Sequence, residues 1–233
     1  MGRYRSEWKY SISNSHAAQI RERLLAVLER DAHAKSNGKY EIHSLYFDDY
    51  QNTCAKENVA GDGIRYKYRI RYYDNDSEHI FLEKKSKNNS YCNKQSCRLT
   101  IEQYNRILEA NVGDILWEGD ELLREFCLAI LTKGFTPKVI VNYEREAFVE
   151  PITNVRVTID SSISASDDFD KFINGAYTRV PILDENMNIL EVKFDDVLSS
   201  YIRKLIQVEK VNQRSFSKYY MSRISIQEFN NCN

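Results

Sequence analysis

The stretch of this sequence that most suggests chemistry is a run of alternating cations, Arg65-Tyr66-Lys67-Tyr68-Arg69-Ile70-Arg71. Successive side chains of a β-strand point to opposite faces, so a strand here would present four cations on one face. Four like charges in a row repel one another and need a polyanion, neighbouring carboxylates or bulk water around them. A solvated outer face is the ordinary explanation of such a run. The rest of the sequence decides between that explanation and a polyanion site.

The same alternation recurs in other stretches that we predict to be strands. Charged side chains share one face at residues 5–12, 78–87, 91–99, 155–160 and 189–195, with apolar side chains on the other face. Two more predicted strands span residues 40–49 and 137–149. Arg and Lys dominate the polar faces, whereas the solvated face of an ordinary sandwich mixes Lys with Glu, Thr and Ser. A sheet that closes with these faces inward would form a barrel lined by cations.

The apolar faces of such a barrel would point outward and need helices to cover them. Amphipathic helical patterns follow Asn14 and Ser15, follow Thr100 with Gln103 as a capping box, and end at Gly134. Residues 51–63 and 161–174 are predicted to be polar loops. The predicted fold class is therefore α+β, an eight-stranded antiparallel β-barrel tunnel lined by charged residues and flanked by amphipathic helices. No repeat or linker divides the chain, so a single domain is predicted over residues 1–233, with a disordered tail at about 225–233.

The composition excludes several classes of protein. Lys and Arg (33) nearly balance Asp and Glu (34), so a basic site requires sorting of charges between faces, and nothing favours nucleic-acid binding. No stretch approaches the roughly 20 apolar residues of a membrane helix, and no signal peptide is evident. Five cysteines without a CxxC pair predict reduced thiols; Cys92 and Cys97 lack the second Cys or His pair of a metal site. These features predict a cytoplasmic protein.

A tunnel lined by cations carries costs of desolvation and self-repulsion that a dense polyanion would offset. Phosphate chains fit, because each phosphoryl unit offers several oxygens to arginine side chains. The few carboxylates on these faces, chiefly Glu191, could hold Mg²⁺ or Mn²⁺ against phosphate oxygens. Phosphoryl transfer needs positioning and charge neutralisation more than a protein nucleophile. Consistently, the sequence contains no GxSxG, HExxH or Walker-type motif.

Seven short motifs occur in a characteristic order along the chain. They are Arg5-Ser6-Glu7-Trp8-Lys9-Tyr10, Ser44-Leu45-Tyr46-Phe47-Asp48, Arg65-Tyr66-Lys67-Tyr68-Arg69-Ile70-Arg71, Leu82-Glu83-Lys84-Lys85, Tyr143-Glu144-Arg145, Arg156-Val157-Thr158-Ile159-Asp160 and Leu190-Glu191-Val192-Lys193. Together they resemble the VTC domain, the polyphosphate polymerase branch of the triphosphate tunnel metalloenzymes. Each motif alone is weakly specific, but seven in order, from Arg5 to about Tyr220, are strongly so.

The resemblance implies a metal-dependent polyphosphate polymerase that uses ATP. Such an enzyme transfers the ATP γ-phosphate to a growing inorganic polyphosphate chain and releases ADP. The residues that the resemblance assigns to catalysis are Lys9, Arg69, Arg71, Lys85, Arg145, Arg156 and Glu191, the last as the ligand of Mn²⁺ or Mg²⁺.

A second set is expected to bind substrate and phosphate. Ser217 and Lys218 match the family segment that covers the tunnel and binds phosphate, and Tyr143 is expected to contribute its hydroxyl. The remaining members of this set are Glu7, Arg65, Lys67, Lys94, Arg98 and Lys193. The expected partners are ATP and inorganic polyphosphate, and no nucleic acid. The sequence contains no membrane segment, so an export channel would be a separate membrane protein partner.

One departure from the wider superfamily bears on the reaction. Many hydrolytic and cyclase members begin with Glu-x-Glu-x-Lys, in which the glutamates bind metal or activate water. Here the first position is Arg5, and replacing a carboxylate with a cation favours holding phosphate over activating water. This favours the polymerase over one alternative, a hydrolase of tripolyphosphate or nucleoside triphosphates. The presence of Glu191 together with Arg and Lys on the predicted strands argues against a second alternative, a non-catalytic polyphosphate-binding module.

Individual residues also keep alternative interpretations. Arg65 and Lys67 either bind phosphate or are solvated charges at the tunnel mouth. Asp48, Asp160 and Glu83 are expected to neutralise neighbouring arginines. The four histidines are scattered and are assigned no chemistry.

Overall fold

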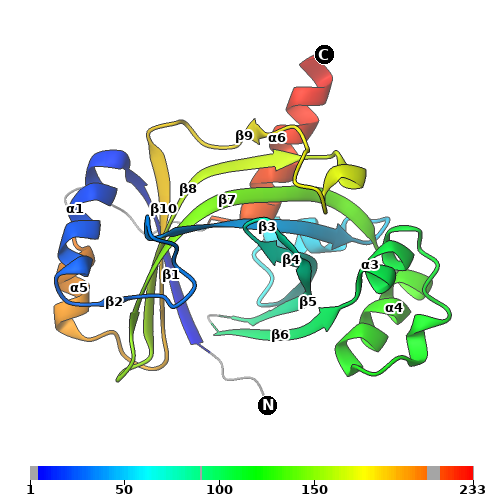
Figure 1. Cartoon of the computed structure of the whole chain (residues 1–233), viewed down its shortest axis with the longest axis horizontal. Helices are drawn as coiled ribbons and strands as arrows, with labels where there is room; N and C mark the ends of the chain where they lie inside the picture. The colour runs from blue at the N-terminus through cyan, green and yellow to red at the C-terminus, as the bar shows by residue number, and fades with distance from the viewer. Residues whose placement is uncertain (1–4, 90, 209–215, 233) are drawn as a thin grey trace.

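The computed structural model describes residues 5–89, 91–208 and 216–232 of the chain (Figure 1). Within these residues one antiparallel sheet contains ten strands: β1 (Arg5–Ser13), β2 (Glu29–Arg30), β3 (Lys39–Asp48), β4 (Ile64–Tyr73), β5 (Asp76–Asn88), β6 (Tyr91–Leu99), β7 (Thr136–Glu150), β8 (Val155–Ser166), β9 (Val180–Pro181) and β10 (Met187–Phe194). The same residues form six α-helices: α1 (Asn14–Leu25), α2 (Thr53–Ala60), α3 (Ile101–Leu108), α4 (Glu121–Lys133), α5 (Ser200–Ile206) and α6 (Lys218–Cys232).

The sheet closes on itself. Hydrogen-bonded neighbours follow one another in the order β7, β3, β4, β5, β6, β1, β10, β8 and back to β7. The short strands β2 and β9 pair with β7 and β8 outside this ring. Among the described residues, the shortest ladder of the ring joins β1 to β6, through Arg5 with Cys92 and Ser6 with Tyr91. The predicted closed antiparallel sheet of eight strands is thereby confirmed.

Strand β4 shows how the sequence sorts the two faces of the ring. Tyr68, Ile70 and Tyr72 are buried in the core outside the ring, where the Tyr68 ring lies 4.8 Å from that of Phe126 on α4. The alternating cations at positions 65, 67, 69 and 71 line the interior instead. The period of two in the sequence therefore predicts the interior of the ring correctly.

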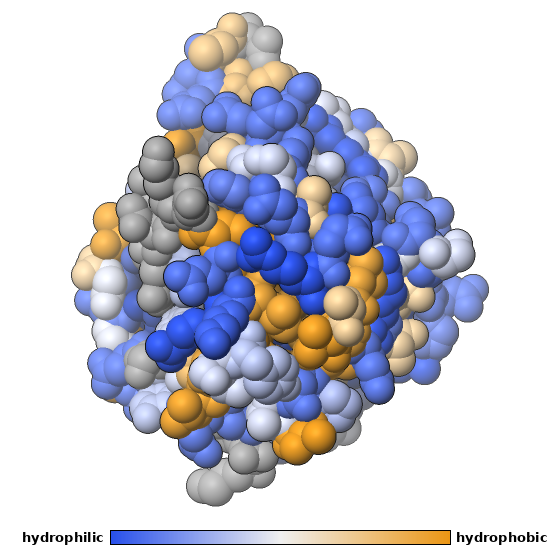
Figure 2. Space-filling model, turned by 90° about the vertical axis from the view of Figure 1, so that its left-hand side faces the viewer, coloured by the Kyte–Doolittle hydropathy of each residue, from blue (hydrophilic) through white to orange (hydrophobic). Residues whose placement is uncertain are grey.

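Helices cover the outer apolar faces on two opposite sides of the ring (Figure 1). On one side Ile20 of α1 and Ile202 of α5 are fully buried against Val157 and Val192. On the other side α3 and α4 belong to a larger core that includes Phe126. Figure 2 looks onto the α1 and α5 side and shows apolar patches among hydrophilic residues. Helices α1, α3 and α4 lie where amphipathic patterns were predicted.

The predicted ends of α3 and α4 are confirmed. The capping box of α3 is present, with Gln103 N donating to Thr100 Oγ1 at 3.1 Å and Thr100 N donating to Gln103 Oε1 at 3.0 Å. Gly134 ends α4 with a φ of +63°, a conformation that glycine adopts without strain.

Helix α2 lies where a polar loop was predicted. Its first backbone N–H groups donate to carboxylates at the end of β3, including Cys54 N to Asp48 Oδ1 at 2.9 Å.

Two other segments are more ordered than predicted. The tail predicted to be disordered at about 225–233 is helical through Cys232, because Ile226 packs into the core and Asn230 Nδ2 donates to Asp167 Oδ2 at 2.8 Å; Asn233 lies outside the described residues. Strand β8 continues into the predicted loop, where Ser164 pairs with Asn142 of β7.

No helix in the described part of the chain is long and apolar enough to cross a membrane.

Candidate functional site

The ring encloses a cavity of about 790 Å³. All eight ring strands contribute lining side chains, as do Asn58 of α2 and the segment before and at the start of α6, residues 216–219. Lysines and arginines dominate the lining, and among the described residues its carboxylates are Glu7 and Glu191. The charged faces of the strands therefore point inward, and the solvated outer face considered for β4 is excluded.

The cavity brings together all but one of the predicted site residues. Those that line it are Glu7, Lys9, Arg65, Lys67, Arg69, Arg71, Lys85, Lys94, Tyr143, Arg145, Arg156, Glu191, Lys193, Ser217 and Lys218. The exception is Arg98, which is exposed near the end of β6, where Nη2 donates to the Glu78 carbonyl oxygen at 3.5 Å. Its register partner is Phe81, two pairs beyond Glu83, so Arg98 shares the inner face but lies past the end of the cavity.

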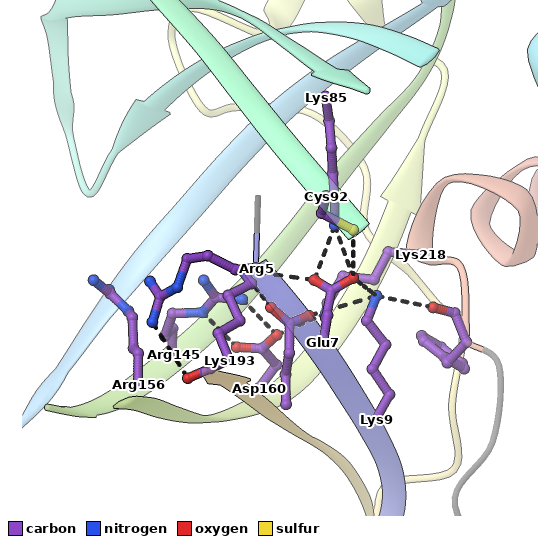
Figure 3. Close-up of polar contacts among 12 residues, drawn as sticks. Arg5, Glu7, Lys9, Lys85, Cys92, Arg145, Arg156, Asp160, Lys193 and Lys218 are labelled. Carbon is purple, nitrogen blue, oxygen red and sulfur yellow. Dashed lines mark hydrogen bonds and ion pairs between the residues drawn. The ribbon is translucent and has the colours of Figure 1, made fainter. Parts of the chain in front are cut away.

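One side of the cavity, which we call the lysine–glutamate wall, consists of Glu7 and Lys9 of β1, Lys85 of β5, and Glu191 and Lys193 of β10. The register of β1 with β10 places Lys9 opposite Glu191 and Glu7 opposite Lys193. Lys85 Nζ donates to both Glu7 oxygens at 2.9 and 3.0 Å, and Lys193 Nζ lies 2.5 Å from Glu191 Oε1. Lys9 Nζ lies between the carboxylates, 3.5 Å from Glu191 and 3.8 Å from Glu7 (Figure 3).

These contacts keep both carboxylates ionised. Burial and the neighbouring Glu191 would raise the pKa of Glu7, but Lys9, Lys85 and Lys193 outweigh them and lower it to about 2. Burial would likewise raise the pKa of Glu191, yet Lys193, Lys9 and Lys85 hold it well below its usual value. Both glutamates are therefore anions throughout the neutral range.

The lysine–glutamate wall suits a hard divalent cation. Glu7 and Glu191 both contact Lys9 and Lys193, so their ionised oxygens converge on one place. No group of three or more His, Cys, Asp or Glu side chains that could hold a metal occurs among the described residues. Mg²⁺ commonly takes one or two carboxylates and completes its shell with phosphate oxygens and water. The residues fit a metal held jointly with a phosphate chain, with Glu191 as the predicted ligand and Glu7 beside it.

The facing part of the lining, which we call the arginine–tyrosine wall, consists of Tyr46 of β3, Arg69 and Arg71 of β4, and Tyr143 of β7. Arg69 Nη1 donates to the Tyr46 hydroxyl at 2.9 Å, and Arg71 Nη2 donates to the Tyr143 hydroxyl at 3.1 Å. Behind them, Glu83 accepts from Arg69 Nε at 2.7 Å. Glu83 is 2% exposed, and despite its burial Arg69, Arg71 and Lys94 lower its pKa. It thus neutralises neighbouring cations, as expected.

A third set of contacts fixes the cations of β7 and β8. Arg145 donates to both oxygens of Asp160, at 2.6 and 2.8 Å, and Lys218 Nζ donates to Asp160 Oδ2 at 2.6 Å. Asp160 is fully buried and neutralises both cations. Arg156 instead reaches Asp31, with Nη1 2.8 Å from Oδ2. No sequence pattern pointed to Asp31 as this partner, because Asp31 lies in a loop far from Arg156 along the chain.

The segment before and at the start of α6 spans one part of the cavity. Lys9 Nζ of β1 donates to the Phe216 carbonyl oxygen at 3.2 Å, and Lys67 Nζ of β4 donates to Ser217 Oγ at 3.1 Å. With the bond from Lys218 to Asp160, the segment contacts three strands of the ring. Lys67 therefore lies inside the cavity. Burial, and the like charges of Lys9 and Lys85, lower its pKa to about 8.

Several lining residues were not assigned a role from the sequence, among them Tyr46, Lys87 and Cys92. Tyr46 is the phenol that bonds Arg69, and Lys87 extends the cation face of β5. The Cys92 thiol lies 3.7 Å from Glu7 Oε2. Strand phase could have found Tyr46 and Lys87, because each shares a face with residues that were selected.

Comparison with known families identifies this architecture. The model of the VTC domain matches residues 4–226. The chain belongs to the VTC domain family. The resemblance carried by the seven sequence motifs is thereby confirmed, whereas a search of curated proteins gave no match.

The VTC domain described here is also similar to solved structures. One is a putative adenylate cyclase from Bacillus halodurans, with 11% sequence identity, coverage of 100% of this chain and 91% of that chain, and a TM-score of 0.47. Another is the PH1819 protein from Pyrococcus horikoshii OT3, with 13% identity, coverage of 97% and 99%, and a TM-score of 0.46. At these TM-scores we draw no conclusion from either structure. Family membership and the cation-lined cavity together support a tunnel fold that binds triphosphate or polyphosphate.

Proposed function

We propose that this VTC domain is a metal-dependent polyphosphate polymerase that transfers the γ-phosphate of ATP to the end of a polyphosphate chain and releases ADP. The observation that carries the proposal is the lining of the cavity, where, among the described residues, cations from seven of the eight ring strands surround two ionised glutamates. Such a surface suits a long polyanion that bears a divalent cation. Membership of the VTC domain family supports the same substrate class.

In this proposal the two walls have separate tasks. The guanidinium groups of Arg69 and Arg71 bind and align the phosphate chain, because planar donors match phosphoryl oxygens in pairs. Glu191 and Glu7 would hold Mn²⁺ or Mg²⁺, which supplies Lewis-acid stabilisation of charge on the transferring phosphoryl group. Lys9 and Lys193 neutralise charge beside it. A terminal oxygen of the chain forms the new bond to the γ-phosphorus, and the bond to ADP breaks with its electron pair leaving on ADP.

One observation favours transfer over hydrolysis. A general base for water works best with a pKa near the working pH. Glu7 is the carboxylate retained from the Glu-x-Glu-x-Lys pattern, and its pKa of about 2 makes it a weak base at neutral pH. The other position of that pattern is Arg5, whose Nε lies 3.1 Å from Asp195 Oδ1. Neither side chain is suited to activate water.

The test is a product analysis with ATP and Mn²⁺. We expect ADP and a ladder of long polyphosphate on gels, both lost in Arg69→Ala and retained in Arg106→Ala, whose arginine is on α3 outside the cavity. ADP with free phosphate and no ladder would support the hydrolase instead. Binding of polyphosphate without turnover would support the non-catalytic module, and either result would overturn the polymerase.

A further inference from the structure

Tyr46 places a phenol hydroxyl among the cations of the cavity. Its side chain is 8% exposed, and the hydroxyl accepts from Arg69 Nη1 at 2.9 Å. The Arg69 guanidinium carbon also lies 5.8 Å from the centre of the Tyr46 ring. In the proposed function Arg69 donates to a phosphate oxygen. The Tyr46 hydroxyl oxygen already accepts from the same guanidinium group.

The elements packed around Tyr46 present mainly positive charge. Strand β4 contributes Lys67, Arg69 and Arg71, β1 contributes Lys9, and α6 contributes Tyr219, whose ring lies 5.3 Å away, and Lys218. The other nearby groups are Tyr143 of β7, Glu83 of β5 and Asp48 of β3 itself. Both carboxylates are already engaged, since Glu83 accepts from Arg69 and Lys94 and Asp48 accepts from Tyr219. The Tyr46 phenol accepts directly from Arg69, so on ionising it would supply negative charge next to this cation.

The surroundings favour the ionised form of this phenol. Burial alone would raise the pKa of Tyr46, but Arg69, Arg71 and Lys67 outweigh burial and lower it to about 7. A lowered pKa means that the anion predominates as the pH rises above that value. At about pH 8 roughly nine-tenths of the phenol would be ionised.

We propose that Tyr46 is an internal anion of the tunnel, which occupies the arginine–tyrosine wall as a phenolate and takes up a proton when a phosphate chain binds there. The inference deepens the proposed function and rests on it, because it requires that phosphate chains bind Arg69. The proton comes from solvent and forms the O–H bond of the neutral phenol, so no other reactant is needed. Phosphate binding at mildly alkaline pH is then coupled to proton uptake.

The first measurement is the ultraviolet absorbance of tyrosinate during a pH titration of the free protein. We expect a component that ionises near neutral pH in the wild type and is missing in Tyr46→Phe. Two matched variants locate it. Tyr104→Phe removes a buried phenol remote from the cavity, and Tyr73→Phe removes the other cavity phenol with a lowered pKa. Loss of the component in Tyr73→Phe, or its absence from the wild type, would overturn the proposal.

The second measurement is calorimetry with tripolyphosphate at about pH 8, in Tris and in HEPES, whose different ionisation enthalpies report the protons exchanged. Lys67 also takes up protons at this pH, so the informative quantity is the difference between proteins. We expect Tyr46→Phe to take up roughly one proton fewer than the wild type. Equal uptake with intact binding overturns this inference alone. Failure of tripolyphosphate to bind the wild type overturns the proposed function and this inference with it.

A second variant guards against a folding defect in Tyr46→Phe. Lys67→Gln keeps the phenol and removes one of the cations that lower its pKa. We expect the tyrosinate component to remain and to move to higher pH, whereas an unchanged titration would contradict the proposed role of the cation cluster.

Discussion

The two walls of the cavity hold their cations in different ways. On the lysine–glutamate wall, three ammonium groups share two carboxylates that both line the cavity. On the arginine–tyrosine wall, two guanidinium groups donate to phenol hydroxyls, and their carboxylate, Glu83, stands behind them. A carboxylate with a pKa of about 2 keeps its charge at neutral pH, whereas a phenol with a pKa of about 7 can lose its charge by taking a proton. The comparison teaches that one wall is fixed in charge and the other adapts to its ligand.

The largest effect should come from the lysine–glutamate wall. We expect Glu191→Gln to reduce ADP release and polyphosphate synthesis about 100-fold or more, because the metal loses its charged ligand. The matched control is Glu144→Gln, which removes a glutamate paired with Lys39 on the outer face of β7 and should leave the rate unchanged. Similar rates for the two variants would contradict the proposal that Glu191 holds the metal.

The next largest effect should come from the arginine–tyrosine wall. We expect Arg71→Lys to weaken tripolyphosphate binding about tenfold, because an ammonium group cannot reproduce the planar pair of donors. Lys85→Arg is the opposite exchange on the other wall, where a point charge balances Glu7, and we expect it to change the affinity less. Calorimetric titration of both variants compares the walls directly. If the two exchanges cost the same, the walls do not differ in how they bind phosphate.

The contribution of Glu7 to stability should depend on pH in the acid range. The folded-state pKa of Glu7 is depressed from 4.5 to about 2, so its stabilising effect is complete above about pH 4.5 and declines as the pH falls toward 2. We expect Glu7→Gln to lower the free energy of unfolding at neutral pH, and the deficit relative to the wild type to shrink below about pH 4.5. Urea unfolding over this pH range measures it. A constant deficit would show that the lysines do not act through the charge of Glu7.

The smallest effect distinguishes two cations of one strand. Lys94 of β6 lines the cavity and donates to Glu83 at 2.9 Å, whereas Arg98 lies beyond the cavity. We expect Lys94→Ala to weaken tripolyphosphate binding about threefold, by loss of one screened charge, and Arg98→Ala to leave it unchanged. A larger effect at Arg98 would mean that the binding surface extends past the cavity.

The pair Lys94 and Arg98 also shows what the sequence can and cannot predict. Strand phase identifies the face on which a side chain lies, and it predicted the inner faces around the ring correctly. It carries no information on how far along each strand the cavity extends, and Arg98 was included for that reason. Nor did it predict the order of the strands around the ring, which is a property of the tertiary structure.

Tertiary contacts account for the other differences. Helix α2 was predicted to be a loop because its own sequence is polar. Its first backbone N–H groups are bound by the carboxylates of Asp48 and Asp49, which lie at and just after the end of β3. Strand β8 extends through a serine-rich stretch as far as Ser166, because β7 continues to pair with it beyond a register shift. The partner of Arg156, Asp31, becomes apparent only when the ring closes.

The short ladder between β1 and β6 gives the ring a seam. In the described residues it contains two pairs, Arg5 with Cys92 and Ser6 with Tyr91, whereas β3 and β7 pair over ten residues. Amide hydrogens along the seam should therefore exchange with deuterated solvent earlier than those of β3 and β7, since fewer bonds must open together. Among the described ladders, this is where we expect the ring to open first.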